Sequence, residues 1–205
     1  IGFRAVRPDF PDTPEATFEL MSRMMDDREG LQRIFTELVL PNLRQTYEDS
    51  IAAAVGADLL ISHPLTLAVP LIAEKSGIPW ISTMVQPLGF FSIYDPPVLG
   101  MVPGAARLQG LGPVFHKVLF GLVSRETSRW LGPWHALRRE IGLPPSPANP
   151  VMAGKHSPRL VLGLFSPLFA PKQRDWPPQT VVTGFPFYEP PGGEPLAPEI
   201  ETFLA

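Results

Sequence analysis

The sequence predicts an α/β protein with a Rossmann-like parallel sheet and helices on both faces. Two short apolar stretches, residues 59–61 and 80–85, flank a helical stretch at residues 65–76. An apolar strand followed by a helix and a second apolar strand indicates parallel strands that are covered on both faces. The 205 residues, 44% of them hydrophobic, are enough for one domain with its own core.

The chain before this unit predicts one strand and two helices. Residues 1–6 alternate apolar with small or polar side chains, as a strand does. Thr13 is a suitable N-cap, and Pro14 suits the first position of a helix. A helical period then covers residues 31–54, with a kink expected at Pro41. The apolar face of the first helix, for which core is favoured over a pliable pocket wall, consists of Phe18, Met21, Met24 and Met25.

Beyond the second strand the sequence predicts a long loop, two helices and two more strands. Residues 96–113 lack a helical period, so we expect an ordered loop there. A helical face extends from Leu111 to Trp130, and Gly132 and Pro133 separate it from a shorter helix. The remaining expected elements are strands at residues 160–164 and 180–183 and a helix that starts at residue 197.

Proline is the compositional outlier, with 27 residues against a usual share of about 5%. These prolines lie between strongly apolar, periodic segments, which favours stiff loops on a folded scaffold over disorder. The composition of residues 190–198 is that of a linker. We therefore divide the chain into a domain at residues 1–188 and a connecting segment at residues 189–205.

Charge and motif content exclude several classes of protein. The net charge is −3 and no basic run occurs, which argues against a nucleic-acid groove. The four histidines, at positions 63, 116, 135 and 156, lack metal-ligand spacing, and neither a nucleophile elbow nor a phosphate loop is present. The absence of cysteine, of an apolar run of about 20 residues and of a signal segment leads us to expect a soluble cytoplasmic protein.

The candidate site lies where the two central strands end. In open parallel sheets, ligands bind outside the carboxyl ends of the strands. His63 and Pro64 follow the first strand, and Gln86 follows the second. An imidazole at that position suits proton transfer near neutral pH, and it equally suits capping of the next helix; both readings stay open.

The loop after the second strand favours an apolar ligand pocket. Phe90 and Phe91 are adjacent, so in an extended segment they cannot both face one core, and one of them should line a cavity or solvent. Trp134 is a second candidate for the pocket, although core packing explains it as well. Asp95 lies in a Tyr-Asp-Pro-Pro turn sequence, and turn formation is favoured over catalysis for this acid.

Four segments in this order resemble one family of enzymes. VRPDFPDT at residues 6–13, the stretch 58–80, QPLGFFSIYDPPV at residues 86–98 and the stretch 164–188 look like the amino-terminal half of bacterial glycosyltransferases. The group is the one that resembles sterol glucosyltransferases and the macrolide and glycopeptide-antibiotic glycosyltransferases. The segment from Asp175 to Phe185 is the most specific part of the resemblance.

The resemblance implies the two-domain glycosyltransferase B fold and an inverting, metal-independent mechanism. The amino-terminal domain of this fold binds the acceptor, and the carboxyl-terminal domain binds a nucleotide-activated sugar, a UDP- or dTDP-sugar, without a further cofactor. The family's catalytic histidine would lie upstream of Ile1 and its nucleotide motif beyond Ala205, so no catalytic residue is assigned. Residues 1–188 would be the acceptor domain without its first strands, and residues 189–205 the interdomain linker and the start of the next helix.

One position departs from the family. Plant relatives have an aspartate that orients the catalytic histidine where this chain has His63, and an imidazole is no permanent anion. His63 therefore either orients the base differently or shapes the acceptor site. The acceptor-binding residues that we expect are His63, Pro64, Gln86, Phe90, Phe91, Asp95 and Trp134.

The leading hypothesis is the acceptor-binding part of a glycosyltransferase that is inactive by itself. Its partners would be a small hydrophobic hydroxylated acceptor and a carboxyl-terminal donor domain on the same or a separate chain, with peripheral membrane contact as a further expectation. The alternatives are a noncatalytic small-molecule binding module and the acceptor subunit of a split two-chain enzyme.

Overall fold

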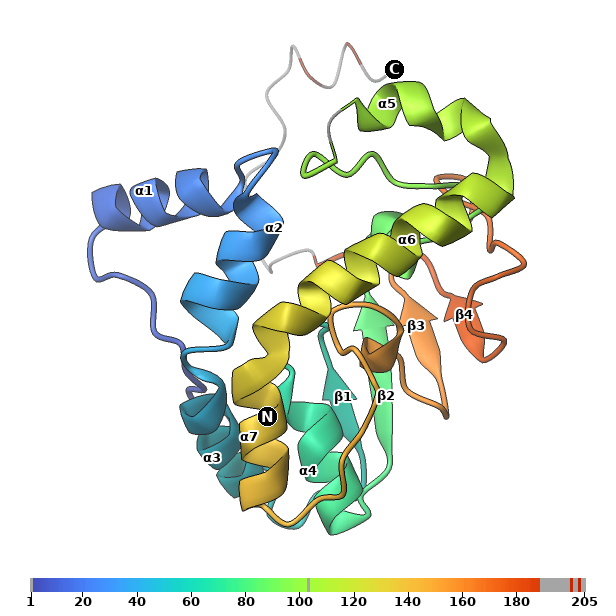
Figure 1. Ribbon diagram of the computed structural model, residues 1–205. Helices are drawn as coiled ribbons and strands as arrows, with labels where there is room; N and C mark the ends of the chain where they lie inside the picture. The colour runs from blue at the N-terminus through green and yellow to red at the C-terminus, as the bar shows by residue number, and fades with distance from the viewer. Residues whose placement is uncertain (1, 103, 189–199, 201–202, 204–205) are drawn as a thin grey trace.

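A parallel sheet of four strands forms the centre of the computed structural model, which describes residues 2–102, 104–188, 200 and 203 (Figure 1). The strand order is β1-β2-β3-β4, and every neighbouring pair is parallel. The strands are β1 (Leu60–Ser62), β2 (Trp80–Met84), β3 (Val161–Gly163) and β4 (Thr180–Val182). The predicted α/β class with a parallel sheet is confirmed.

The helices fall into three groups along the chain. Before β1 lie α1 (Pro14–Met24), α2 (Gly30–Arg33), the π-helical turn η1 (Ile34–Val39) and α3 (Leu43–Ala53). The crossover between β1 and β2 is α4 (Ala68–Ser76). Between β2 and β3 lie η2 (Pro87–Phe90), α5 (Ala105–Leu108), η3 (Gln109–Leu111), α6 (Gly112–Ser128), η4 (Arg129–Leu131), α7 (Gly132–Glu140) and η5 (Ala153–Lys155).

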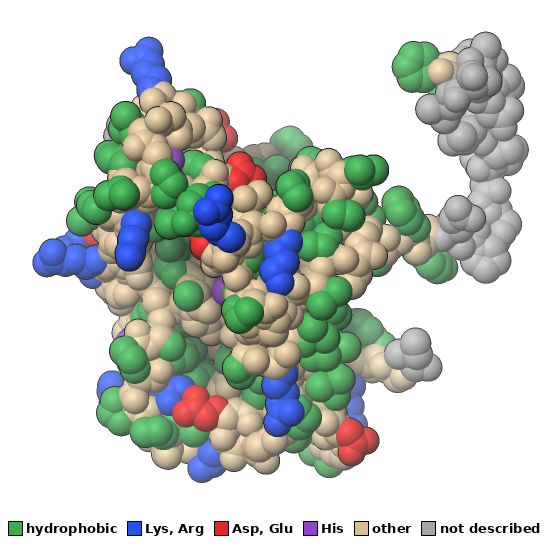
Figure 2. Space-filling view, turned by 90° about the vertical axis from the view of Figure 1, so that its right-hand side faces the viewer, with side chains coloured by type: hydrophobic (Ala, Val, Ile, Leu, Met, Phe, Trp, Pro, Cys, Tyr) green, Lys and Arg blue, Asp and Glu red, His purple; other side chains and the backbone are tan. Residues whose placement is uncertain are grey.

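The two faces of the sheet are covered by other parts of the chain to different extents. Strand register places Ser82, Met84 and Val161 on one face, and all three side chains are buried. The other face carries Ile61 and Val181, which are 62% and 50% exposed. Apolar side chains are also visible over much of the surface in Figure 2, interspersed with charged ones. Among the described residues, the core therefore lies mainly on one side of the sheet.

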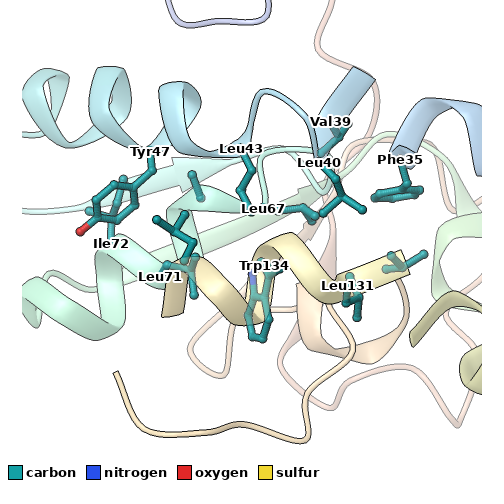
Figure 3. Close-up of a cluster of buried hydrophobic side chains, with 13 residues drawn as sticks. Phe35, Val39, Leu40, Leu43, Tyr47, Leu67, Leu71, Ile72, Leu131 and Trp134 are labelled. Atoms are coloured by element: carbon teal, nitrogen blue, oxygen red, sulfur yellow. The ribbon is translucent and has the colours of Figure 1, made fainter. Parts of the chain in front are cut away.

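The main core forms where α4 packs between the sheet and the helices α3 and α7. Side chains from these elements point toward one another in Figure 3, and Leu71 and Leu131 are 0% exposed. Burying one such side chain stabilises the folded state by about 1.5–3 kcal/mol. The buried members are Phe35, Val39, Leu40, Leu43, Tyr47, Leu67, Ala68, Leu71, Ile72, Leu131, Trp134, Leu137 and Val151.

A nearly buried arginine ties α7 to α4. The Arg138 side chain is 5% exposed, and its two terminal nitrogens donate to the two carboxylate oxygens of Glu74 at 2.6 and 2.7 Å. Its Nε and Nη2 also donate to the carbonyl of Pro144, at 3.0 and 2.7 Å. The hydrogen bonds from Arg138 are the main cause that lowers the pKa of Glu74. A bidentate pair of this kind fixes geometry as well as charge.

The predicted strand at residues 1–6 is wrong. Residues 2–6 have no regular structure and are exposed, because they form no hydrogen-bonded ladder with the sheet. The chain is instead anchored at Arg7, whose Nε and Nη2 donate to the carboxylate of Asp49 at 2.8 and 2.7 Å. These bonds lower the pKa of Asp49 to about 2.

The first helix begins as predicted, but its apolar face is only partly core. The Thr13 hydroxyl accepts a hydrogen bond from the Ala16 amide at 3.3 Å, as an N-cap does. Met24 is buried and its backbone carbonyl lies close to Gly30 at the start of α2, whereas Phe18 and Met25 are 74% and 80% exposed. The core interpretation is wrong for these two residues, because α1 packs against α2 near its carboxyl end and leaves the rest of its surface open (Figure 1).

The other predicted helices differ from the structure in their bounds. Pro41 interrupts the helix at residues 31–54 completely, because proline has no amide hydrogen to donate. The loop expected at residues 96–113 is helical from residue 105 onward. Gly132 and Pro133 form the first turn of α7, where a proline is tolerated. The expected linker and final helix, at residues 189–205, lie almost wholly outside the described residues.

We expect Arg138→Leu to lower the free energy of unfolding by about 2–4 kcal/mol, because it removes several charge-assisted hydrogen bonds from a buried site. The matched control is Arg139→Leu, one residue along α7, where the side chain is exposed and the change should be within about 0.5 kcal/mol. Urea unfolding followed by circular dichroism measures both. Equal effects at the two positions would contradict the structural role of Arg138.

Candidate functional site

The candidate site lies beyond the carboxyl ends of the strands. In Figure 1 the chain leaves β2 through η2 into a long loop that leads to α5, and the corner between α1 and α2 lies beyond the same edge. Parallel pairing places the exits of all four strands at this edge. The loop and the corner therefore form the walls of the site.

A cavity of about 790 Å³ opens between the α1–α2 corner and this loop. The loop and α5 contribute an apolar wall, which includes Val98, Leu99, Met101 and Val102. The corner contributes polar groups. The other lining residues are Arg28, Glu29, Gln32, Gly100, Gly104, Ala105, Ala106 and Arg107. We call this space the main cavity; it is suited to a ligand with an apolar body and polar substituents.

The two walls approach each other closely at the backbone. A Cβ atom at Gly100 would lie 1.6 Å from the carbonyl oxygen of Asp27, so only glycine fits the loop at this point. The corner itself is closed by Asp26, whose Oδ1 accepts from the amides of Arg28 at 2.9 Å and Glu29 at 2.7 Å. These backbone hydrogen bonds lower the pKa of Asp26. The loop and the corner thus lie in close backbone contact, and a hydrogen-bonded turn closes the corner.

A second contact, from the far end of the chain, fixes the start of the loop. Asp175 accepts from the Ser92 hydroxyl and from the Ile93 amide, both at 2.7 Å. The Ser92 oxygen in turn accepts from the amides of Tyr94 at 3.1 Å and Asp95 at 3.2 Å. Asp95 is exposed in this turn, which agrees with the turn interpretation of that acid.

Phe90 and Phe91 lie in two different hydrophobic clusters. Phe90 is 8% exposed and stacks between Trp176 and His156, at centroid distances of 4.0 and 5.2 Å. Phe91 has a left-handed backbone, with φ of 51°, which turns its ring toward Phe120. Phe90 packs inward, whereas Phe91 is only partly buried, so one of the pair does reach toward solvent, but neither lines the main cavity.

His63 lies in the turn between β1 and α4 and does not cap that helix, whose N-cap residue is Leu67 and which has no side-chain cap. Its Nδ1 accepts a hydrogen bond from the Leu65 amide at 3.3 Å, and burial lowers its pKa. The ring is therefore neutral near pH 7, and with Nδ1 accepting, the proton lies on Nε2. In this state Nε2 can donate a hydrogen bond but cannot accept a proton. Pro64 and Gln86 lie at the same edge of the sheet, and Gln86 is exposed.

A smaller cavity, of about 320 Å³, lies beside the residues that follow His63 and Pro64 in the chain. Leu65, Thr66 and Leu67 line it on one side, and Arg7 and Phe10 are among the residues on the other. Trp134, by contrast, is 3% exposed in the main core, where the Arg138 guanidinium lies 5.1 Å from its ring. The structure brings His63 and Gln86 to the edge of the site and places Trp134 away from it.

A buried lysine below the loop was not foreseen. Lys155 Nζ lies 4.5 Å from the centre of the Phe91 ring and donates to the Val151 carbonyl at 2.8 Å. Burial lowers the pKa of Lys155 to about 7, and burial together with the charge of Lys155 lowers the pKa of His156 to about 4. A lysine in a loop gives no sequence signal of burial, whereas Asp175 at least lay in the segment most specific to the resemblance.

The described part of the chain gives no direct support for a metal site or a membrane span. Across the described residues, no three His, Asp or Glu side chains are grouped as metal ligands would be. Within those residues there is also no helix with the length and hydrophobicity that crossing a bilayer requires.

Two known proteins are similar to this chain. It is 30% identical over 201 residues to O-mycaminosyltylonolide 6-deoxyallosyltransferase of Streptomyces fradiae, an alignment that covers 95% of this chain and 46% of that protein. It is 31% identical over 147 residues to a sterol 3-beta-glucosyltransferase of Leptosphaeria maculans, covering 68% of this chain and 10% of that protein. The chain thus spans about half the length of the first relative. No protein-family model matches. The resemblance to macrolide and sterol glycosyltransferases is confirmed.

We expect Lys155 to make stability depend on pH. Above about pH 7 the folded protein holds Lys155 neutral, whereas the unfolded chain stays protonated up to about 10.5. Unfolding therefore takes up a proton between these values, and stability rises with pH across that window, by at most about 1.4 kcal/mol per unit. Lys155→Met should remove this rise and should be more stable than the parent chain at pH 6.

Urea unfolding at a series of pH values between 6 and 10 measures the effect. The matched control is the exposed Lys75, changed to Met, which should keep the slope of the parent chain. Parallel curves for all three proteins would show that Lys155 does not titrate in this range.

Proposed function

We propose that this chain, a relative of macrolide and sterol glycosyltransferases, is the acceptor-binding part of an inverting glycosyltransferase. The whole protein would move a sugar from a nucleotide-sugar donor to a hydroxyl of a hydrophobic small molecule or lipid. One relative is named for a glycosylated macrolide acceptor and the other for a sterol. Both acceptor types are large, mostly apolar and hydroxylated, which is the class that we propose here.

The observation that carries this proposal is the main cavity. Its volume of about 790 Å³ lies within the range of about 300–1,000 Å³ that is usual for small-molecule sites. It lies beyond the carboxyl ends of a parallel sheet, where ligands of such folds bind. Its wall of Val98, Leu99, Met101 and Val102 suits an apolar ring system, and Gln32 and Arg107 offer polar contacts to its substituents.

The residues of this chain would bind and orient the acceptor, and no residue is proposed as the base. His63 could present its Nε2 hydrogen to an acceptor oxygen at the edge of the sheet, which is a positioning role. Asp175 and Gly100 would keep the wall of the cavity in place. The donor, a UDP- or dTDP-sugar, would bind to a separate domain, on the same or another chain, without a metal or further cofactor.

We expect Val98→Glu to weaken acceptor binding about tenfold or more. Val98 is 55% exposed on the apolar wall, so the new carboxylate costs little stability but removes apolar contact worth about 1.5 kcal/mol. The control is Val55→Glu, at a residue that is 83% exposed and does not line the main cavity. Calorimetric titration with O-mycaminosyltylonolide and with a cyclodextrin-solubilised sterol gives the dissociation constants. Equal affinities of the two variants would place the acceptor elsewhere.

We expect the 205-residue chain by itself to transfer no sugar, because it spans only 46% of the Streptomyces transferase. The assay measures release of UDP or dTDP from the corresponding glucose donors in the presence of acceptor. The comparison protein is a chimera that adds the part of the Streptomyces transferase with which this chain does not align. Turnover by the 205-residue chain would contradict the division of roles, whereas acceptor binding without turnover agrees with it.

A further inference from the structure

The charges of this protein are unevenly distributed along the chain. All 20 acidic residues lie outside residues 96–125, although the protein as a whole has a net charge of −3. The same segment contains three cationic side chains, Arg107, Lys117 and Arg125. It comprises the second half of the loop after β2, α5, η3 and most of α6. This part of the molecule is therefore locally cationic.

The helix α6 also exposes an apolar stripe. Val114, Val118 and Leu122 are 82%, 62% and 60% exposed, and Leu111, just before the helix, is 55% exposed. Their spacing of three and four residues places them on one side of the helix. The opposite side is buried, through His116, Phe120, Val123 and Thr127. The stripe therefore points away from the core.

Cationic side chains accompany the stripe. By helical spacing, Arg125 lies among the apolar positions and Lys117 lies at their edge, and both side chains are exposed. Arg129, at the end of the helix, already pairs with Glu126. Figure 2, which faces the side of the molecule on the right of Figure 1, shows hydrophobic side chains next to Lys and Arg side chains. Apolar and cationic groups thus form one mixed surface.

We propose that this surface, Leu111, Val114, Lys117, Val118, Leu122 and Arg125, binds to a membrane that contains anionic lipids. The apolar side chains would enter the boundary between headgroups and acyl chains, and the cations would contact lipid phosphates. A segment of thirty residues without one carboxylate complements a negative surface and would be repelled by a positive one. This charge complementarity is what selects an anionic bilayer as the occupant.

The surface continues into the proposed acceptor site. Leu122 lines a cavity of about 420 Å³ together with Met101 and Val102. The same Met101 and Val102 also line the main cavity. If the proposed function holds, a hydrophobic acceptor dissolved in the membrane reaches the main cavity along this path, and membrane contact supplies the substrate.

Sedimentation with lipid vesicles tests the proposal. We expect the 205-residue chain to bind vesicles of phosphatidylcholine with 30% phosphatidylglycerol and to bind pure phosphatidylcholine far more weakly. Val118→Asp combined with Leu122→Asp should weaken binding at least tenfold. Lys117→Gln combined with Arg125→Gln should weaken it about fivefold per cation, since each is worth about 1 kcal/mol at such a surface, and should reduce its salt dependence.

The matched controls are Val55→Asp and Lys75→Gln, at residues that are exposed outside this surface and should bind as the parent chain does. Thermal melts by circular dichroism identify any variant that fails to fold. If the aspartate pair does not fold, the glutamine pair still tests the proposal, because it adds no charge to an apolar site. Equal binding of variants and controls, or no preference for anionic vesicles, would overturn the proposal. So would a concentration-dependent dimer that the aspartate pair abolishes, because a second copy would then cover the stripe.

Calorimetric titration of the same variants with O-mycaminosyltylonolide separates this proposal from the proposed function. Unchanged acceptor affinity with lost vesicle binding supports the membrane surface and leaves the cavity intact. Vesicle binding without any acceptor affinity would support the surface and contradict the acceptor function.

Discussion

Parallel pairing of the four strands is the constraint on which the rest of this structure depends. Parallel neighbours need a crossover, and α4 supplies it between β1 and β2 while its buried face forms the centre of the main core. The same pairing brings every strand exit to one edge. The loop after β2 is therefore held beside chain that follows β3, which is how Asp175 comes within hydrogen-bond distance of Ser92. Core and site are thus two results of one topology.

The site combines rigid backbone with adaptable side chains. Asp175 accepts hydrogen bonds from the start of the loop, and Gly100 lies close to the Asp27 carbonyl at its middle. Between and beyond these points the wall of the main cavity is built from aliphatic side chains of different sizes. Lys155 lies below this loop, with its Nζ near the Phe91 ring. Burial lowers the pKa of Lys155, so this amine loses its proton more readily than an exposed lysine does.

Local sequence patterns predicted the elements whose partners are close in the chain. The unit of strand, crossover helix and strand and the Thr13 cap depend on contacts within a few residues, and they were predicted well. Pro41 was expected only to kink the helix that it interrupts completely. The exposure of Phe18 and Met25 was not predicted, because it depends on how much of α1 packs against the rest of the molecule. The direction of the Phe91 ring was not predicted for a different reason, since a positive φ has no sequence signature in a non-glycine residue. The hydrogen bond from Ser92 to Asp175 joins positions more than eighty residues apart, which no periodicity in the sequence reveals.

The close approach of Gly100 to the Asp27 carbonyl also bears on how such a protein can diversify. The loop meets the rest of the molecule through hydrogen bonds to Asp175 at Ser92 and through a close backbone approach at Gly100, so the exposed Val98 between these points is free to change without disturbing the sheet. Exchange of Val98 for a larger or more polar residue would alter the shape of the main cavity while these contacts stay the same. A lineage with this arrangement can reshape the cavity by small local substitutions, provided that position 100 remains glycine.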